Sequence, residues 1–218
     1  MQNTESGTNQ ATVIGRIAGT PVYSHTVLGE GFYRMELSCP RFSGYQDTIP
    51  VTVPGRLVDI KEMTEGRTVC IRGRFQSHNR HDPDKTRLVL SVFAKEIGLM
   101  EGAWTDLATN NQIFLDGYVC RIPVYRKTPL GREIADILLA VNRSYNKSDY
   151  IPCTVWGRNA RYAGTLPQGT RVVVQGRIQS RNYEKKLPDG TMEERTAFEV
   201  SVHSVEPAED YRKAVEEG

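Results

Sequence analysis

Nearly the same sequence occurs twice in this chain of 218 residues. Residues 21–23 (Pro-Val-Tyr) recur as residues 123–125, at a spacing of 102 residues. After one inserted residue, the run Gly-Arg-Phe-Gln-Ser at 73–77 lines up with Gly-Arg-Ile-Gln-Ser at 176–180, at a spacing of 103 residues. A repeat of this length is a whole domain, because the repeats of solenoid proteins span roughly 20–50 residues. We therefore expect one fold to be present in two copies.

The hydrophobic periodicity within each copy is two residues. In the segment 149–156, for example, Ile151 and Val155 alternate with Tyr150 and Trp156. This alternation indicates half-buried β-strands. In the second copy the predicted strands are 112–119 with a continuation near 124–127, 132–142, 149–156, 170–183 and 194–205, and in the first copy they lie near 10–17, 32–39, 47–53, 67–79 and 86–97.

The only helical pattern of the second copy is short and lies near residues 159–165, between the third and fourth strands. Five long strands with a helix at this place are typical of an OB-fold barrel. The sequence thus predicts an all-β protein with two tandem five-stranded OB-fold barrels, each with a short helix between strands 3 and 4. The predicted divisions are a flexible N-terminus at 1–8, a first barrel at 9–100, a linker at 101–110, a second barrel at 111–206 and an acidic tail at 207–218.

Charge is distributed unevenly between the copies, although the net charge is only +2. Residues 110–205 carry 14 Lys and Arg against 9 Asp and Glu, whereas residues 1–100 carry 12 against 10. A basic second copy is what phosphate binding requires. Because no apolar run is long enough to span a membrane and residues 1–10 lack an apolar signal core, we expect a cytoplasmic, nucleoid-associated protein with no membrane partner.

The four cysteines are predicted to be packing residues. In the alignment of the copies, they replace small apolar residues: Cys39 matches Val141, Cys70 matches Val173, Cys120 matches Ala18 and Cys153 matches Val51. Buried free thiols behave as small apolar groups. No metal-ligand spacing, paired carboxylates or nucleophile with an adjacent base is apparent, so we expect no metal, no cofactor and no catalytic residue.

Strand alternation places aromatic side chains of the second copy in solvent. Tyr150 and Trp156 lie opposite the apolar face of their strand, Tyr183 lies opposite the apolar face of 170–183, and Tyr145 falls in a polar turn. Unpaired bases stack on such rings, each worth about 1–3 kcal/mol, while cations follow the phosphates. The cations predicted to do so are Arg143, Lys147, Arg158, Arg177, Arg181, Lys185 and Lys186.

The same rings have other interpretations. Aromatic side chains on the outside of a barrel also pack in subunit interfaces or under loops. A protein-interaction adaptor of the primosome type, or an RNA-binding OB protein, is therefore an alternative to a binder of single-stranded DNA, because stacking alone does not distinguish the nucleic acids.

Comparison of the two copies separates their expected roles. The counterparts of Trp156, Tyr150, Tyr145 and Tyr183 in the first copy are Pro54, Thr48, Ser43 and Arg80, whereas the core positions stay apolar. Phe42 and Tyr45 could compensate in part, from a shifted position. The second barrel is accordingly expected to provide most of the affinity for nucleic acid.

At these residues the chain resembles the bacterial single-stranded DNA-binding protein family. The resemblance covers 111–205 and rests on the opening strand 113–117, the run Leu-Ala-Val-Asn at 139–142, the strand 150–157 and the long strand 169–178. It implies base stacking at Tyr145, Tyr150, Trp156 and Tyr183, and a non-catalytic role in DNA replication, recombination or repair with little dependence on base sequence. Because members of the family usually assemble four barrels, it also implies a homodimer.

The chain departs from the family at its end. Typical members finish with a disordered linker and an acidic tip that contains an aromatic residue and docks other enzymes, whereas this sequence ends Glu216-Glu217-Gly218. Recruitment of replication enzymes by that route is therefore not expected.

Overall fold

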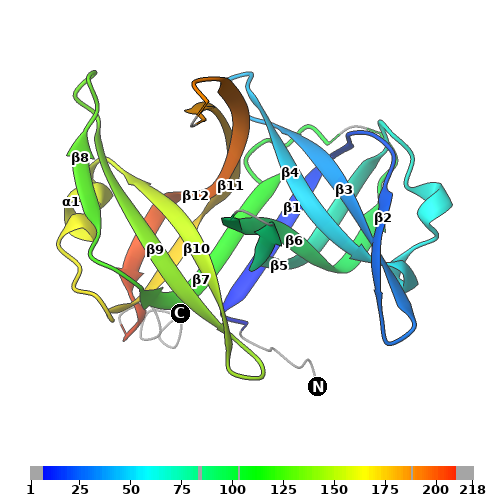
Figure 1. Cartoon of the computed structure of the whole chain (residues 1–218), viewed down its shortest axis with the longest axis horizontal. Coiled ribbons are helices and arrows are strands. Elements are labelled where there is room, and N and C mark those ends of the chain that lie inside the picture. Colours follow the sequence, from blue (N-terminus) through cyan, green and yellow to red (C-terminus); the bar gives the residue numbers. More distant parts are fainter. Residues whose placement is uncertain (1–6, 83–84, 103, 188, 210–218) are drawn as a thin grey trace.

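The computed structural model describes residues 7–82, 85–102, 104–187 and 189–209, and within them the chain forms two β-barrels beside each other (Figure 1). Most of the predicted flexible N-terminus and acidic tail lies outside the described residues. The strands are β1 (Asn9–Ile17), β2 (Val22–Val27), β3 (Glu30–Pro40), β4 (Gln46–Pro54), β5 (Thr68–Asp82), β6 (Lys85–Leu99), β7 (Asn111–Val119), β8 (Val124–Lys127), β9 (Glu133–Arg143), β10 (Lys147–Trp156), β11 (Arg171–Lys186) and β12 (Met192–Pro207).

Both barrels have the same topology, with β1–β6 in the first and β7–β12 in the second. Most neighbouring strands are antiparallel, but β4 pairs in parallel with β6, and β10 pairs in parallel with β12. The pairings of β1 with β3 and of β7 with β9 close the barrels. The predicted all-β fold with two OB barrels is confirmed. The sequence analysis missed β2, whose side chains are mostly exposed and therefore show no alternation.

The predicted helix is present in the second barrel as α1 (Arg158–Gly164), but it is absent from the corresponding place in the first barrel. Two 3₁₀ turns, Gly55–Leu57 and Ile60–Glu62, occupy that place. The prediction of a helix in each barrel was therefore wrong for the first. Ala160 and Ala163 are buried on one face of α1 and favour a helix, whereas β-branched residues in the first copy have a lower helix propensity.

A β-bulge occurs at the same place in both barrels, where a glycine allows two backbones to approach. The register with the next strand shifts at Gly73 and at Gly176. A Cβ atom at Gly73 would lie 2.0 Å from the carbonyl oxygen of Phe93, and one at Gly176 would lie 2.3 Å from that of Ser201. Both long strands can therefore bend sharply only because these positions lack a side chain.

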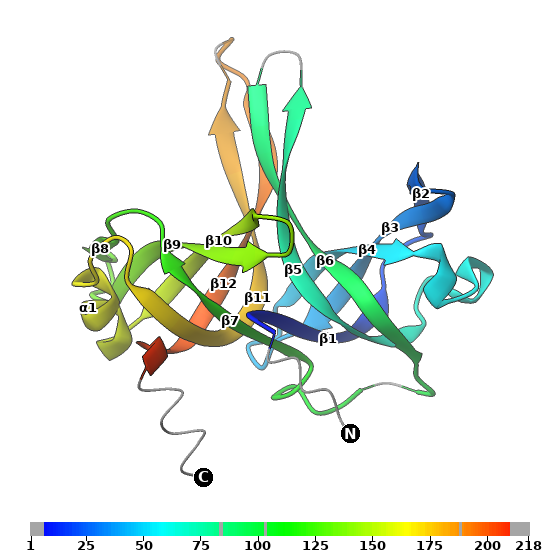
Figure 2. The ribbon, with the colours of Figure 1, turned by 90° about the horizontal axis from the view of Figure 1, so that it is seen from below.

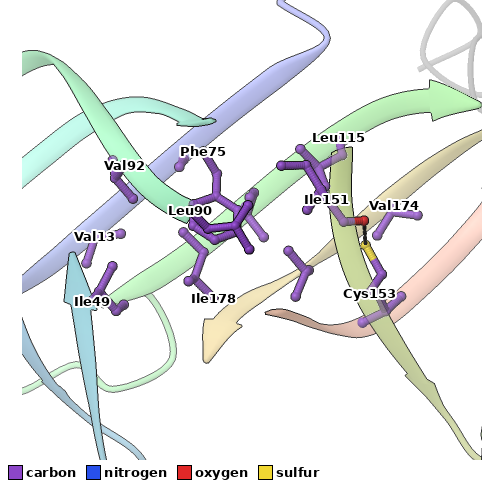
Figure 3. Packing of buried hydrophobic residues seen from close by; sticks show 14 of the residues in the cluster. Val13, Ile49, Phe75, Leu90, Val92, Leu115, Ile151, Cys153, Val174 and Ile178 are labelled. Atoms are coloured by element: carbon purple, nitrogen blue, oxygen red, sulfur yellow. Dashed lines mark hydrogen bonds between the residues drawn. The ribbon is translucent and has the colours of Figure 1, made fainter. Parts of the chain in front are cut away.

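Buried apolar side chains from both barrels form the core. Figure 3 shows buried side chains of both barrels, among them Val13, Phe75 and Val92 of the first and Leu115 and Ile151 of the second. All of these side chains come from the apolar positions of alternating strands. Because alternate residues of each strand are buried in this core, the residues between them point toward the outside of the barrel.

The cysteines are free thiols within this packing. Cys39 and Cys153 are buried, as predicted, whereas Cys70 and Cys120 are half-buried. Burial raises the pKa of the Cys39 thiol to about 12 and also raises the pKa of Cys153.

The two barrels join through one continuous sheet. Strands β1 and β7 pair antiparallel, and Ala11 lies opposite Ile113. These two residues are also 102 positions apart, so an approximate twofold axis passes between them and relates the copies. Apart from residue 103, the segment 101–110 contains no helix or strand. We call the contact region between the barrels, which includes the β1–β7 pairing and the side chains that bond across it, the seam.

Candidate nucleic-acid interface

Strand β10 presents two aromatic side chains to solvent. Tyr150 is 44% exposed and Trp156 is 39% exposed, whereas Ile151 and Val155 between them are buried. The indole Nε1 of Trp156 donates a hydrogen bond to Ser201 Oγ at 3.2 Å, on the neighbouring strand β12. The edge of the indole is thus fixed while part of the ring remains accessible for stacking.

The β11–β12 hairpin carries the third ring and several cations away from the barrel (Figure 2). Tyr183 is 38% exposed, and the guanidinium carbon of Arg181 lies 5.8 Å from the centre of its ring. Lys185 and Lys186 are exposed further along the strand. Because the extra residue of the bulge, His203, belongs to β12, the alternation along β11 that placed Tyr183 outside is preserved.

Tyr145 has the most exposed ring, at 95%, in the turn between β9 and β10. Tyr145 and Asn146 both have positive φ, 62° and 54°. This conformation suits Asn and is uncommon for Tyr. Lys147 is exposed directly after the turn, at the start of β10, and Arg158 is exposed at the start of α1.

The turn that carries Tyr145 lies against the first barrel. The backbone N–H of Tyr150 donates to Ser77 Oγ at 2.7 Å, and the N–H of Ser77 donates to Asp149 Oδ1 at 2.7 Å. Trp156 lies six residues further along β10, about 20 Å away at the rise of an extended strand. The four predicted rings therefore lie along a path that begins at the seam, and they do not form one compact platform.

Arg177, predicted to contact phosphate, forms an ion pair across the seam. Its Nη2 lies 2.9 Å from Oδ2 of Asp47, a fully buried carboxylate of the first barrel. Asp47 also accepts a hydrogen bond from Arg41 Nε at 2.8 Å and one from the backbone N–H of Ser180 at 2.8 Å. Arg177 therefore shares one buried carboxylate with Arg41 and helps to join the two barrels.

Arg143 is the counterpart of Arg41 on the other side of the approximate twofold axis. Its Nε lies 3.3 Å from Oδ2 of the fully buried Asp149, and its Nη2 donates to the carbonyl oxygen of Ser77 at 3.5 Å. Burial raises the pKa of Asp149, while the Ser77 N–H and the Arg143 charge act in the opposite direction. Arg143 and Arg177 are thus seam residues, and the other predicted cations remain the candidates for phosphate contacts.

The sequence analysis did not identify the carboxylates and hydroxyls that hold the seam. The repeat itself contained an indication of this contact, because the residues that bond across the seam recur in both copies at the repeat spacing. The recurring pairs are Arg41 with Arg143, Asp47 with Asp149, and Ser77 with Ser180. Charged and hydroxyl residues repeated in both copies, outside the apolar pattern, could have indicated a symmetric contact.

A groove of about 660 Å³ runs beside Trp156 on the outer face of the second barrel. Arg121, Arg126 and Arg181 line it together with residues of the first barrel. Arg126 pairs with Asp136 at 3.0 Å, whereas Arg121 and Arg181 form no ion pair with any residue that the structure describes. The groove thus combines an accessible ring with positive charge, the arrangement that single-stranded nucleic acid requires.

The described part of the chain contains no group of three or more His, Cys, Asp or Glu side chains arranged to hold a metal ion. None of its helices is long and apolar enough to cross a membrane.

Comparison with known proteins matches residues 110–208 to the model of the single-strand binding protein family. The chain is 39% identical over 83 residues to single-stranded DNA-binding protein B of Bacillus subtilis, covering 35% of this chain and 74% of that protein. It is 40% identical over 81 residues to single-stranded DNA-binding protein 2 of Listeria innocua, covering 34% of this chain and 51% of that protein. The chain belongs to the single-strand binding protein family.

The fold of the whole chain also has a counterpart among solved structures. The single-stranded DNA-binding protein of Thermus aquaticus matches with a TM-score of 0.74 and 24% identity, over 92% of this chain and 93% of that one. The match therefore extends to the first barrel, which the family model does not reach.

Proposed function

We propose that this protein binds single-stranded DNA without catalysis and largely independently of base sequence, in DNA replication, recombination or repair. The main support is the set of exposed rings beside exposed cations on the second barrel, in a chain that belongs to the single-strand binding protein family. Bases would stack on Tyr145, Tyr150, Trp156 and Tyr183. Lys147, Arg158, Arg181, Lys185 and Lys186 would contact phosphates, while Arg143 and Arg177 would hold the seam from which the path starts.

The fluorescence of Trp156 provides a direct test. The chain has two tryptophans, so a Trp104→Phe background leaves Trp156 as the single reporter. We expect oligo(dT) to quench it, and we expect the apparent affinity to fall as salt rises, because phosphate contacts release counterions. Unchanged fluorescence together with the absence of a gel shift at low salt would refute the proposal. An equally strong response to a matched RNA oligomer would favour the RNA-binding alternative.

Alanine variants identify the rings that bind. Replacing Trp156 or Tyr183 is expected to weaken binding by about 5–150-fold each, the equivalent of 1–3 kcal/mol per stacked base. Tyr118 provides a matched control, since it is 38% exposed like Tyr183 and also has an arginine, Arg171, over its ring at 5.7 Å. Tyr118→Ala should bind like the unaltered protein.

The proposal extends to assembly and location. A homodimer would bring four barrels together, in agreement with the family resemblance, and sedimentation of the full chain would measure its mass. A cytoplasmic, nucleoid-associated location follows from the proposed ligand.

A further inference from the structure

The turn between β3 and β4 of the first barrel, residues 41–45, crosses the seam and lies beside β11 of the second barrel (Figure 1). Nη2 of Arg41 donates to the carbonyl oxygen of Ser180 at 3.2 Å, and the N–H of Thr48 donates to Ser180 Oγ at 3.0 Å. These contacts join two segments more than 130 residues apart in the sequence. The first barrel thus provides one side of the region around Trp156.

Two aromatic rings of this turn line hollows that Trp156 also lines. Tyr45 lines the groove of about 660 Å³ together with Trp156, and Phe42 lines a second hollow of about 430 Å³ together with Trp156. Phe42 is 75% exposed and Tyr45 is 56% exposed, so most of the surface of both side chains remains accessible. The guanidinium carbon of Arg41 lies 5.1 Å from the centre of the Tyr45 ring.

The approximate twofold axis supplies an internal comparison. The counterparts of Phe42, Tyr45 and Trp156 at the repeat spacing are Ser144, Lys147 and Pro54. Ser144 lines a comparable hollow of about 620 Å³ on the opposite side of the seam. All three rings are thus present on one side, and all three are missing from the equivalent positions on the other. This difference indicates that the three rings act together, although they come from different barrels.

The chemistry around these rings favours one occupant. Arg121 and Arg181 line the larger hollow, and neither forms an ion pair within the described part of the chain. Rings that expose their faces beside such cations suit a chain of bases and phosphates better than an apolar segment of protein, which would leave the cations unpaired. The groove is also continuous with the interface proposed above.

We propose that Phe42 and Tyr45 of the first barrel and Trp156 of the second barrel form one composite base-stacking subsite. Single-stranded DNA bound along the second barrel passes over this subsite onto the turn of the first barrel, so that both barrels of one chain hold the same strand. This inference rests on the proposed function and adds to it that the bound DNA strand crosses the seam from one barrel to the other.

A double-mutant cycle on the full chain tests the subsite. Fluorescence anisotropy of a labelled oligo(dT) would give the dissociation constants of the unaltered chain, F42A/Y45A, W156A and the triple variant. We expect F42A/Y45A to weaken binding about tenfold or more, as loss of stacked bases does. We expect the triple variant to lose less than the product of the two separate factors, because rings that share a subsite do not contribute independently.

Tyr23→Ala is the matched control. Tyr23 is 57% exposed in the first barrel, nearly as much as Tyr45, and it lies on the edge strand β2. We expect this variant to bind oligo(dT) like the unaltered chain. Equal weakening by Tyr23→Ala would overturn the proposal, because the loss would then follow from any exposed ring of the first barrel.

The outcomes separate the two proposals. If the unaltered chain binds oligo(dT) and W156A weakens binding while F42A/Y45A does not, the composite subsite is refuted and the proposed function stands. A triple variant whose loss equals the product of the separate factors would also refute a shared subsite. If F42A/Y45A changes the sedimenting mass but not the affinity, the rings contact a second copy of the chain and the inference fails. Absence of binding by the unaltered chain would refute both proposals.

Discussion

Replacing Asp47 by Asn would test how far the seam depends on a single buried carboxylate. Asp47 is fully buried and accepts hydrogen bonds from Arg41 Nε at 2.8 Å, Arg177 Nη2 at 2.9 Å and the Ser180 N–H at 2.8 Å. In D47N, the remaining carbonyl oxygen can still accept from Ser180. The amide nitrogen, however, would face the guanidinium groups of Arg41 and Arg177 and cannot accept hydrogen bonds from them. The negative charge that held both arginines is also lost.

The size of the effect follows from the burial of the partners. Removing one member of a buried ion pair costs about 3–5 kcal/mol. The side chains of Arg41 and Arg177 keep 22% and 25% of their surface exposed. Water therefore compensates them in part, and we expect a loss of about 3 kcal/mol, the lower end of that range. For a chain of this length, such a loss lowers the melting temperature by about 6–12 °C.

Asp149→Asn is the matched control, because Asp149 occupies the equivalent buried position. Its Oδ2 lies 3.3 Å from Arg143 Nε but has no hydrogen-bond partner within the described structure. Burial raises the pKa of this carboxyl, so ionisation at this site opposes folding. Removing the charge relieves that cost, and we expect D149N to stay within about 1 kcal/mol of the unaltered protein.

Thermal melts followed by circular dichroism at pH 7 would measure both variants. The folded state binds a proton at Asp149 more tightly than the unfolded chain does, because its pKa is raised on folding. Acidification through the interval between the unfolded-state and folded-state pKa should therefore stabilise the unaltered protein relative to D149N. An equal fall in melting temperature for D47N and D149N, or no fall for D47N, would contradict the reasoning.

Two further predictions concern charge and thiol reactivity. Replacing both Lys185 and Lys186 by Gln should reduce the slope of log affinity against log salt by about 1.4, at about 0.7 per phosphate contact of a single strand; an unchanged slope in an oligo(dT) titration would show that these lysines do not contact phosphate. In the native protein at pH 8, the buried thiols of Cys39 and Cys153 should resist iodoacetamide, because burial raises their pKa values and excludes the reagent. Burial raises the pKa of Cys70 too, but this thiol is half-buried and should react faster than the other two. Peptide mass spectrometry would measure the labelling, and modification of Cys39 at the rate of Cys70 would contradict the packing.

Most of the fold could be predicted from the sequence. The repeat gave the number of barrels, and alternation along strands such as β10 gave both the strands and the exposed side of Tyr150 and Trp156. Prediction failed where the pattern was weak. Strand β2 shows no alternation because it is exposed on both sides. In the first barrel, β-branched Val58 stands at the position of the helix-favouring Ala160 of α1, and two 3₁₀ turns form there instead of an α-helix.

The candidate site was only partly predictable. The exposure of a ring depends on its position in one strand, so the sequence by itself determined that Trp156, Tyr150 and Tyr183 face outward. Whether a cationic side chain can contact phosphate depends on which residues face it in the folded protein. Arg177 looks like a phosphate ligand in the sequence, but it pairs with Asp47, which lies 130 residues away along the chain.

Only the tertiary structure decided which residues share a site. It separated Tyr145 from Trp156 by the length of β10, and it brought Phe42 and Tyr45 of the first copy to the groove of the second. The physical reason is that strand alternation is a local property with a period of two residues, readable from neighbours in the sequence. Contacts across the seam depend on how the β1–β7 pairing orients two complete barrels, and no periodicity within either barrel records that orientation.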